Sequence, residues 1–212
     1  MRVTHVTSTF PPYRGGTGNV VYHQAKELAR LGHDVVVATA GERTAPVDDP
    51  PGVRVHRLPA PLRIGNAAAL RGLGALLDAS QVVHLHYPCY FAGEQVARHC
   101  RARHIPYVVT YHQDALFPFP MSLAAQFHHV TAGAWILRGA RLVAATTSDY
   151  AAHSRLRSLG PGRLVELPNG VDAERFRPGI DAASPRERHG LRAGRGVVLF
   201  VGGLDRAHYF KG

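Results

Sequence analysis

Residues 2–34 read RVTHVTSTFPPYRGGTGNVVYHQAKELARLGHD, and this stretch decides the fold. Its first residues alternate polar and apolar side chains as a strand does, and a Pro-Pro pair then excludes regular structure. A glycine cluster follows, and from Asn19 to Leu31 apolar residues recur on one face of a predicted helix. Gly32 stands where a left-handed residue ends a helix, and the apolar run at 35–39 predicts a buried strand. Strand, glycine loop, helix and strand form the first βαβ unit of a parallel sheet.

Composition and charge narrow the class of protein. The chain has 212 residues, of which 45% are hydrophobic and 8% aromatic, values that are normal for a globular protein. It contains no apolar run of membrane-spanning length and no signal-peptide pattern, so we expect a cytoplasmic protein. Its two cysteines, Cys89 and Cys100, lack metal or redox spacing and are expected to be reduced. The charge of +10 favours anionic ligands, acidic lipid headgroups or nucleic acid, although compositional bias of the genome explains it equally well.

The rest of the chain continues the alternation of strands and helices. Further strands are predicted at 53–58, 82–86, 107–112, 141–146 and 164–167, and helices at 66–78, 91–103 and 122–138, with Ser148 and Asp149 capping another. We therefore expect one α/β domain over residues 1–178. A polar linker with one short helix is expected at 179–194. Residues 195–212 are interpreted as the first buried strand, at 196–203, and the glycine loop of a second, truncated domain.

The glycine cluster before the first helix is a candidate phosphate site. Gly15 to Gly18 would offer bare backbone N–H groups and the positive end of a helix to an anion. A dinucleotide-binding fingerprint is the rival interpretation. Because Val21 replaces its third glycine, the pattern argues against a nicotinamide site. A glycine-rich turn without a ligand remains the plain alternative.

Histidines gather at the predicted carboxyl edge of the sheet. His84 and His86 share a face of one strand, and His112 ends the next strand along the chain. A histidine there can donate a hydrogen bond to a sugar hydroxyl or a phosphate, and His112 is the favoured candidate. His84 is interpreted as a half-buried structural histidine. Asp114 is a candidate acceptor for a sugar hydroxyl, with a solvated loop aspartate as the alternative.

Together these features resemble retaining glycosyltransferases of family 4, which have the GT-B fold. The carriers are Pro11-Pro12 with Gly15-Gly16, Leu28 to Val35, Val83 to His86, Thr110 to His112, Pro168 to Asp172 with Phe176 and Pro178, and Phe200 to Gly212. The resemblance implies a Rossmann-like three-layer α/β domain with a mostly parallel sheet, the N-terminal half of a GT-B fold. In that family the N-terminal domain binds the acceptor, and the C-terminal domain binds a nucleotide-diphosphate sugar across a cleft.

The resemblance also implies roles for particular residues. Gly15 and Gly16 would approach the donor diphosphate, and His112 would act beside the transferred sugar as the catalytic residue. His86 and Asp114 are then expected to bind the acceptor or the sugar. Retention of configuration and the absence of any bound metal or cofactor come from the resemblance as well.

The tail supplies two further candidates for the donor site. Lys211 matches the phosphate-binding lysine of the family. The family usually carries an arginine after the glycine at the end of the tail's strand. That position is Gly203 here, and Arg206 is the candidate replacement. The E-x7-E carboxylates of the family would lie beyond Gly212, so we expect the 212-residue chain not to transfer sugar alone.

The sequence thus favours a glycosyltransferase acting from a nucleotide-sugar donor on a sugar or lipid-linked acceptor, with peripheral membrane contact. A non-catalytic α/β module that binds a phosphorylated or lipid-linked ligand is the alternative. Nucleic-acid binding rests on charge alone, because clustered lysines and aromatic-basic repeats are missing from the sequence.

Overall fold

A computed structural model describes residues 1–13, 15–41, 49–115, 117–160, 162–181, 183–192 and 195–201. The chain divides into two compact units, Met1–Asn169 and Gly170–Gly212, which are described separately. The domain boundaries expected from the sequence, at 178 and 194, stay predictions.

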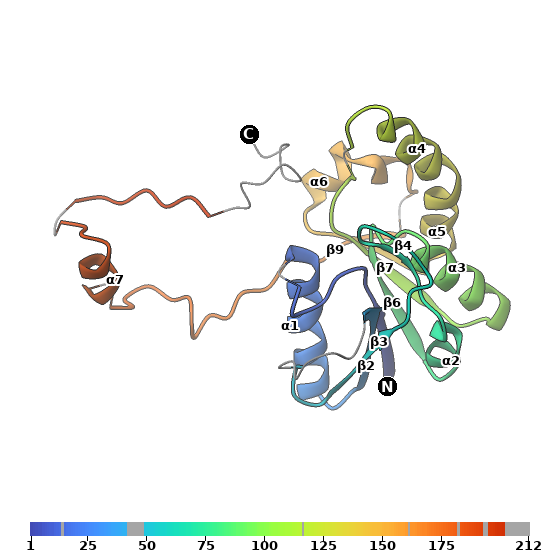
Figure 1. Ribbon diagram of the computed structural model, residues 1–212, viewed down its shortest axis with the longest axis horizontal. Coiled ribbons are helices and arrows are strands. Elements are labelled where there is room, and N and C mark those ends of the chain that lie inside the picture. The colour runs from blue at the N-terminus through green and yellow to red at the C-terminus, as the bar shows by residue number, and fades with distance from the viewer. Residues whose placement is uncertain are drawn as a thin grey trace. The chain divides into compact units, whose positions relative to one another are not determined.

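The first unit is built on one parallel sheet of seven strands (Figure 1). The strands are β1 (Arg2–Val6), β2 (Asp34–Ala40), β3 (Val53–Leu58), β6 (Val82–Tyr87), β7 (Tyr107–Tyr111), β8 (Leu142–Ala145) and β9 (Leu164–Glu166). Their order in the sheet is β3-β2-β1-β6-β7-β8-β9, and every neighbouring pair is parallel. The strand order therefore reverses between β1 and β6. In open α/β sheets a ligand crevice forms at such a reversal, outside the carboxyl ends of the strands.

Helices cover both faces of this sheet, which gives the predicted three-layer α/β architecture (Figure 1). They are α1 (Gly16–Arg30), α2 (Leu73–Asp78), α3 (Ala92–Arg103), α4 (Met121–His128), α5 (Ala134–Gly139) and α6 (Ser148–His153). Helix α1 buries Val21 and Ala25 against Val37 of β2. The opposite face of the sheet packs Leu85 and Val109 against α3 and α5.

The first helix begins earlier than the sequence predicted. It starts at Gly16 instead of Asn19 and ends at Arg30, so Gly16 and Gly18 lie in its first turn. Leu31 is the residue that caps its carboxyl end and is exposed, not part of the buried face. Gly32 has a φ of 85°, which confirms the predicted left-handed ending.

The predicted helix at 66–78 is only half correct. Its first part is strand β5 (Ala67–Ala69), which forms an antiparallel hairpin with the preceding β4 (Leu62–Ile64), and only α2 is helical. Gly65 and Gly72 have φ values of 58° and 84°, and these left-handed conformations interrupt any helix through them. Alanine-rich composition predicted a helix here because local propensity does not reveal these turns.

Two smaller predictions are also corrected. The long helix predicted at 122–138 consists of α4 and α5 joined by a π-helical segment, His129–Gly133. Helix α6 is capped by Thr147, whose hydroxyl accepts a hydrogen bond from the backbone N–H of Tyr150. Thr147 has the extended backbone of an N-cap residue, whereas Ser148 is already helical.

The described part of the second unit contains one short helix, α7 (Ala183–Arg188), within the predicted linker. The buried strand predicted at 196–203 is wrong for its described part, because residues 195–201 form no strand and Val198 is fully exposed. A parallel strand needs a hydrogen-bonded neighbour, and none of the described strands pairs with this segment. Among the described residues, no helix combines the length and the apolar character needed to cross a bilayer.

Candidate functional site

The amino end of α1 presents backbone donors at the carboxyl edge of the sheet. Gly15 is the N-cap residue and has an extended backbone, and its carbonyl accepts from the N–H of Asn19 at 3.0 Å. The N–H groups of Gly16, Thr17 and Gly18 precede the first intrahelical bond. The first turn carries no acidic residue. This end of the helix is therefore positive and suited to an anion.

The glycines of this turn meet very different surroundings. A Cβ at Gly16 would have no described atom within 4 Å, so the backbone is open on that side. A Cβ at Gly18 would lie 2.9 Å from the carbonyl oxygen of Thr9 and 3.1 Å from Cα of Phe10. Gly18 thus serves the packing of α1 on the preceding loop, while Gly16 leaves space for a ligand. At Gly15 a Cβ would meet the Tyr13 ring at 2.8 Å.

Three histidines beside this edge form a hydrogen-bonded chain. Nδ1 of His5 lies 2.9 Å from Nε2 of His86, and Nδ1 of His86 lies 3.0 Å from Nε2 of His112. The ring planes differ by 22° and 21°, so the three imidazoles are nearly parallel. His84 stacks on His86 with 4.2 Å between ring centroids, but its Nε2 bonds the hydroxyl of Thr110 at 2.7 Å instead.

The sheet explains why these rings meet. His5 of β1 pairs in register with His84 of β6, and His86 pairs with Thr110 of β7. His112 directly follows β7, and its backbone N–H donates to the carbonyl of Tyr87 at 2.9 Å. Side chains two residues apart on a strand share a face, so all four histidines lie on one face of the sheet.

Burial keeps these histidines neutral. His5 and His86 are fully buried, and burial lowers the pKa of each well below the usual 6.5, with repulsion by the other rings as a smaller cause. Burial also lowers the pKa of His84 to about 4, reinforced by His112. The pKa of His112, which is only partly buried, falls to about 4 for the same reason.

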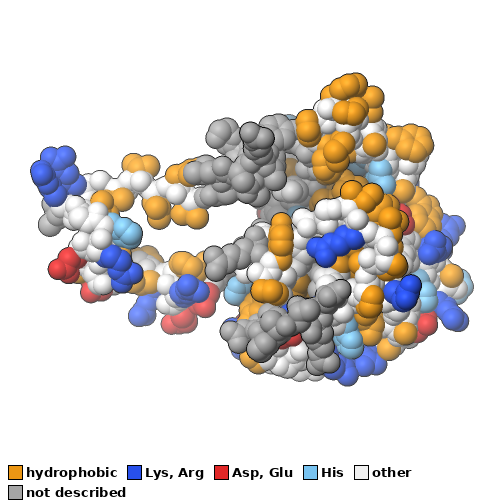
Figure 2. All heavy atoms as spheres, in the orientation of Figure 1, with side chains coloured by type: hydrophobic (Ala, Val, Ile, Leu, Met, Phe, Trp, Pro, Cys, Tyr) orange, Lys and Arg blue, Asp and Glu red, His pale blue; other side chains and the backbone are white. Residues whose placement is uncertain are grey.

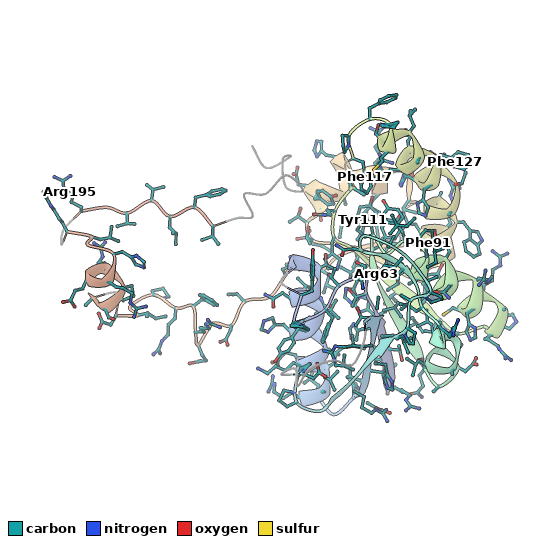
Figure 3. All side chains as sticks on the ribbon, in the orientation of Figure 1. Arg63, Phe91, Tyr111, Phe117, Phe127 and Arg195 are labelled. Carbon is teal, nitrogen blue, oxygen red and sulfur yellow. The ribbon has the colours of Figure 1, made fainter. Side chains whose placement is uncertain are left out.

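The two residues predicted to bind the acceptor or the sugar, His86 and Asp114, both bond other side chains of the protein. Both ring nitrogens of His86 are occupied by other histidines, so a ligand would meet His112 first. Asp114 accepts the hydroxyl of Tyr111 at Oδ1, and Nε of Arg155 lies 3.8 Å from the same oxygen. Tyr111 is buried in the interior of the unit (Figure 3), and burial together with this bond raises its pKa. The plain alternative for Asp114, a solvated loop residue, does not describe it.

By distance, one group of described residues could hold a metal ion, namely His5, His84 and His86, whose ligand atoms lie within 4.8 Å of one another. One nitrogen of each ring is engaged otherwise, because Nδ1 of His5 bonds Nε2 of His86 and Nε2 of His84 bonds the hydroxyl of Thr110. Near-parallel rings linked through N–H···N bonds do not point their lone pairs at one common centre. The group is therefore better described as a hydrogen-bond network than as a metal cage.

His5 was not predicted from the sequence. Its signal was a lone histidine in the strand RVTHV, which becomes informative only once the pairing of β1 with β6 is known. Of the predicted donor-site residues, Gly15 and Gly16 are described above, whereas Lys211 and Arg206 lie outside the described residues.

Comparison with known proteins agrees with this architecture. Residues 15–170 match the family model of the glycosyl transferase 4-like domain. The chain is 31% identical to D-inositol 3-phosphate glycosyltransferase 1 of Catenulispora acidiphila over 91% of this chain and 49% of the relative. It is 30% identical to the GDP-mannose-dependent alpha-mannosyltransferase of Mycobacterium tuberculosis, over 96% of this chain and 56% of that protein.

A solved structure supports the same fold. The crystal structure of Anabaena HepE in complex with UDP-glucose superposes with a TM-score of 0.63 at 15% identity, covering 90% of this chain and 50% of HepE. A parallel seven-stranded sheet with helices on both faces, and a glycine turn where the strand order reverses, defines a Rossmann-like α/β protein of the GT-B kind. The chain belongs to the glycosyl transferase 4-like family, and it spans about half the length of the curated relatives that it matches.

Proposed function

We propose that this chain is the acceptor-side part of a retaining glycosyltransferase that moves a sugar from a nucleotide-diphosphate sugar to a sugar or lipid-linked acceptor. The observation that carries the proposal is the open amino end of α1, where Gly16 leaves room for a phosphate. Two relatives named as glycosyltransferases, and a UDP-glucose complex with the same fold, support it.

The main chemical task is to stabilise the departing nucleoside diphosphate. The bond between the anomeric carbon and the diphosphate oxygen breaks, and negative charge develops on that oxygen. The N–H groups of Gly16 and the positive end of α1 would stabilise this charge from the described unit. Lys211 and Arg206 would contribute from the tail, and their part in the proposal rests on the family resemblance alone.

The proton balance needs no carboxylate base. The acceptor oxygen bonds the anomeric carbon on the face that the diphosphate leaves, and its proton passes to the departing phosphate oxygen. His112 would hold the transferred sugar, and His86 would act through His112. Asp114, tied to Tyr111, would shape the edge of the acceptor site. No bound metal or cofactor is part of this mechanism.

A transfer assay on the enzyme as its gene encodes it tests the proposal. Gly16→Val should abolish transfer because the isopropyl group fills the space of the diphosphate, while Gly160→Ala, at a second open glycine, should not. His112→Ala should lower turnover by roughly two orders of magnitude, which is typical for a lost transition-state donor. Normal transfer by Gly16→Val would contradict the donor site, and a change of under threefold for His112→Ala would make that residue structural.

The 212-residue chain alone is proposed to be inactive, since it spans about half of its relatives. Calorimetric titration of this chain with UDP-, GDP- and ADP-sugars should give weak or undetectable binding. Micromolar donor binding or measurable transfer would contradict the division of the site between two domains.

Peripheral membrane contact belongs to the same proposal and is supported by α4. Between Asp114 and Arg138 the sequence holds no Asp, Glu, Lys or Arg. Leu123, Phe127 and Val130 are more than half exposed on this helical segment. Hydrophobic spheres gather over α4 in Figure 2, and Phe127 projects from it in Figure 3.

His128 of this segment is turned toward α3 instead. Nε2 of His128 lies 2.6 Å from a carboxylate oxygen of Glu94 on α3. An ordinary surface helix has the opposite arrangement, with its apolar stripe toward the core. Because the chain carries a formal charge of +10, we propose an anionic lipid bilayer as the occupant of this surface.

Vesicle flotation tests this surface. The chain should bind vesicles that contain phosphatidylglycerol and bind pure phosphatidylcholine vesicles less. Phe127→Ser should reduce the binding several-fold, whereas Phe176→Ser, an equally exposed phenylalanine of the second unit, should not. Equal loss in both variants, no binding at all, or self-association through α4 in sedimentation would each contradict the proposal.

A further inference from the structure

The hydrogen-bonded chain of three histidines constrains which nitrogen of each ring carries the hydrogen. His5, His86 and His112 are joined by two N···N contacts of 2.9 and 3.0 Å, so each contact needs one hydrogen atom. All three rings are neutral near pH 7, because burial lowers their pKa values, and a neutral imidazole carries one N–H. His86 must therefore donate to one neighbour and accept from the other.

This requirement couples the tautomers of the three rings. In one order every ring carries its hydrogen on Nδ1, so that His5 donates to His86 and His86 donates to His112. In the other order every ring carries it on Nε2, and the donations run from His112 to His86 to His5. A mixed arrangement leaves two hydrogens or two lone pairs facing each other across a 3 Å contact.

The buried end of the histidine chain, His5, favours one of these two orders. Nε2 of His5 is buried and has no hydrogen-bond partner among the described residues. In the Nε2 order this atom would be an orphaned N–H, and in the Nδ1 order it is a bare acceptor. Among backbone groups, orphaned buried N–H donors are rarer in native structures than under-satisfied acceptors, and the same preference applied to the imidazole favours the Nδ1 order.

The open end of the chain is His112. Its Nε2 is taken by His86, and its Nδ1 makes no hydrogen bond to any described residue on a ring that is only partly buried. The tautomer set inside the protein therefore decides whether the outer nitrogen of His112 donates or accepts.

We propose that His86, with His5 behind it, is a positioning residue that holds His112 in the Nδ1–H tautomer, so that His112 meets its ligand as a neutral hydrogen-bond donor. The ligand class is an oxygen acceptor, such as a sugar hydroxyl or a phosphate oxygen. The inference rests on the proposed function for its consequence: His112 cannot take the acceptor's proton through Nδ1, so that proton goes to the departing phosphate.

Neighbouring His84 provides a matched control. It lies on the same strand as His86 and stacks on it, but its Nε2 bonds Thr110 and it is not a link of the chain. Replacing His84 by leucine removes a partly buried histidine of the same face without breaking either N···N contact.

The test is a two-bond ¹H–¹⁵N spectrum of the histidine rings in the 212-residue chain at pH 7, assigned with the single variants. We expect the hydrogen on Nδ1 in His5, His86 and His112. His86→Leu should turn His112 into a mixture of tautomers, because its Nε2 then faces no nitrogen, and His84→Leu should leave its tautomer unchanged.

A hydrogen on Nε2 of His112 in the unaltered chain, or mixed tautomers there, would overturn the proposal. So would a single unchanged Nδ1–H tautomer in His86→Leu. If His86→Leu does not fold, the spectra of the unaltered protein and of His84→Leu still decide which tautomer the three histidines adopt. The spectra need no donor or acceptor, so this inference can fail while sugar transfer stands, and the transfer assay can fail while the tautomer is as expected.

Discussion

At the scale of single residues, Gly16 and Gly18 lie in the same helical turn but differ in the space that surrounds them. Gly16→Ala should leave the free energy of unfolding unchanged within about 0.5 kcal/mol, because the added methyl group enters open space. Gly18→Ala should lower it by roughly 1–3 kcal/mol, since Cβ would press on the backbone at Thr9 and Phe10. Urea denaturation of both variants measures the difference, and equal stabilities would mean that α1 can shift away from the loop.

The residue scale also marks the limit of the sequence. Strand periodicity and the parallel-sheet rule brought His86 and His112 to one edge correctly. They did not reveal His5, because its partner His86 lies 81 positions further along the chain and only the register of β1 with β6 brings them together. Asp114 was visible as a residue type, but its ties to Tyr111 and Arg155 depend on side-chain packing that periodicity does not encode.

At the scale of elements, helices and strands with a clear period were predicted well, and those governed by turns were not. Strand β3 has the predicted bounds at both ends, because Val53 to Leu58 alternate cleanly between Gly52 and Pro59. The β4–β5 hairpin was missed because left-handed Gly65 and Gly72 override the helix propensity of the alanines between them. The π segment before α5 has no sequence period of its own that would predict it.

That π segment carries a testable consequence at Gly133. Glycine-to-alanine changes inside helices usually stabilise by up to about 1 kcal/mol. At Gly133 the added Cβ would lie 2.8 Å from the hydroxyl oxygen of Tyr87, whose ring is buried, so the sign should reverse and Gly133→Ala should destabilise. Thermal unfolding followed by circular dichroism measures this, with Gly160→Ala as the unhindered control. A higher melting temperature for Gly133→Ala would mean that the helix is not held close to β6.

At the scale of the whole molecule, the buried histidines should make stability depend on pH. The pKa values of His84 and His112 fall to about 4 in the folded protein, and those of His5 and His86 lie well below 6.5. Between pH 6.5 and 4 the unfolded chain thus binds protons that the folded protein does not, so stability is full above pH 6.5 and is lost as the pH falls.

Denaturant unfolding at pH 7 and pH 5 measures this loss, which should reach roughly 1–2 kcal/mol for each buried histidine. His86→Leu should make the dependence shallower by about one proton. His23→Gln, at an exposed position of α1, should leave it unchanged. A free energy of unfolding that stays constant between these two pH values would show that the rings are protonated or exposed in solution.

The division into two units gives the last prediction, that residues 1–169 fold without the rest. The seven strands of the sheet and all residues of both core clusters lie before Asn169, so that unit buries its own apolar surface. In the second unit Val197 to Val201 are exposed, and an apolar run of this kind favours association between molecules.

A chain ending at Asn169 should therefore keep its melting temperature within about 2 °C, because the truncation removes no core contact. It should also sediment as a monomer at concentrations where the 212-residue chain associates. A chain ending at Gly160 is the matched control and should lose stability, because it lacks β9 and Arg163, whose guanidinium donates to the carbonyls of Arg138 and Ala140. Loss of cooperative unfolding in the 1–169 chain would mean that the sheet depends on the second unit.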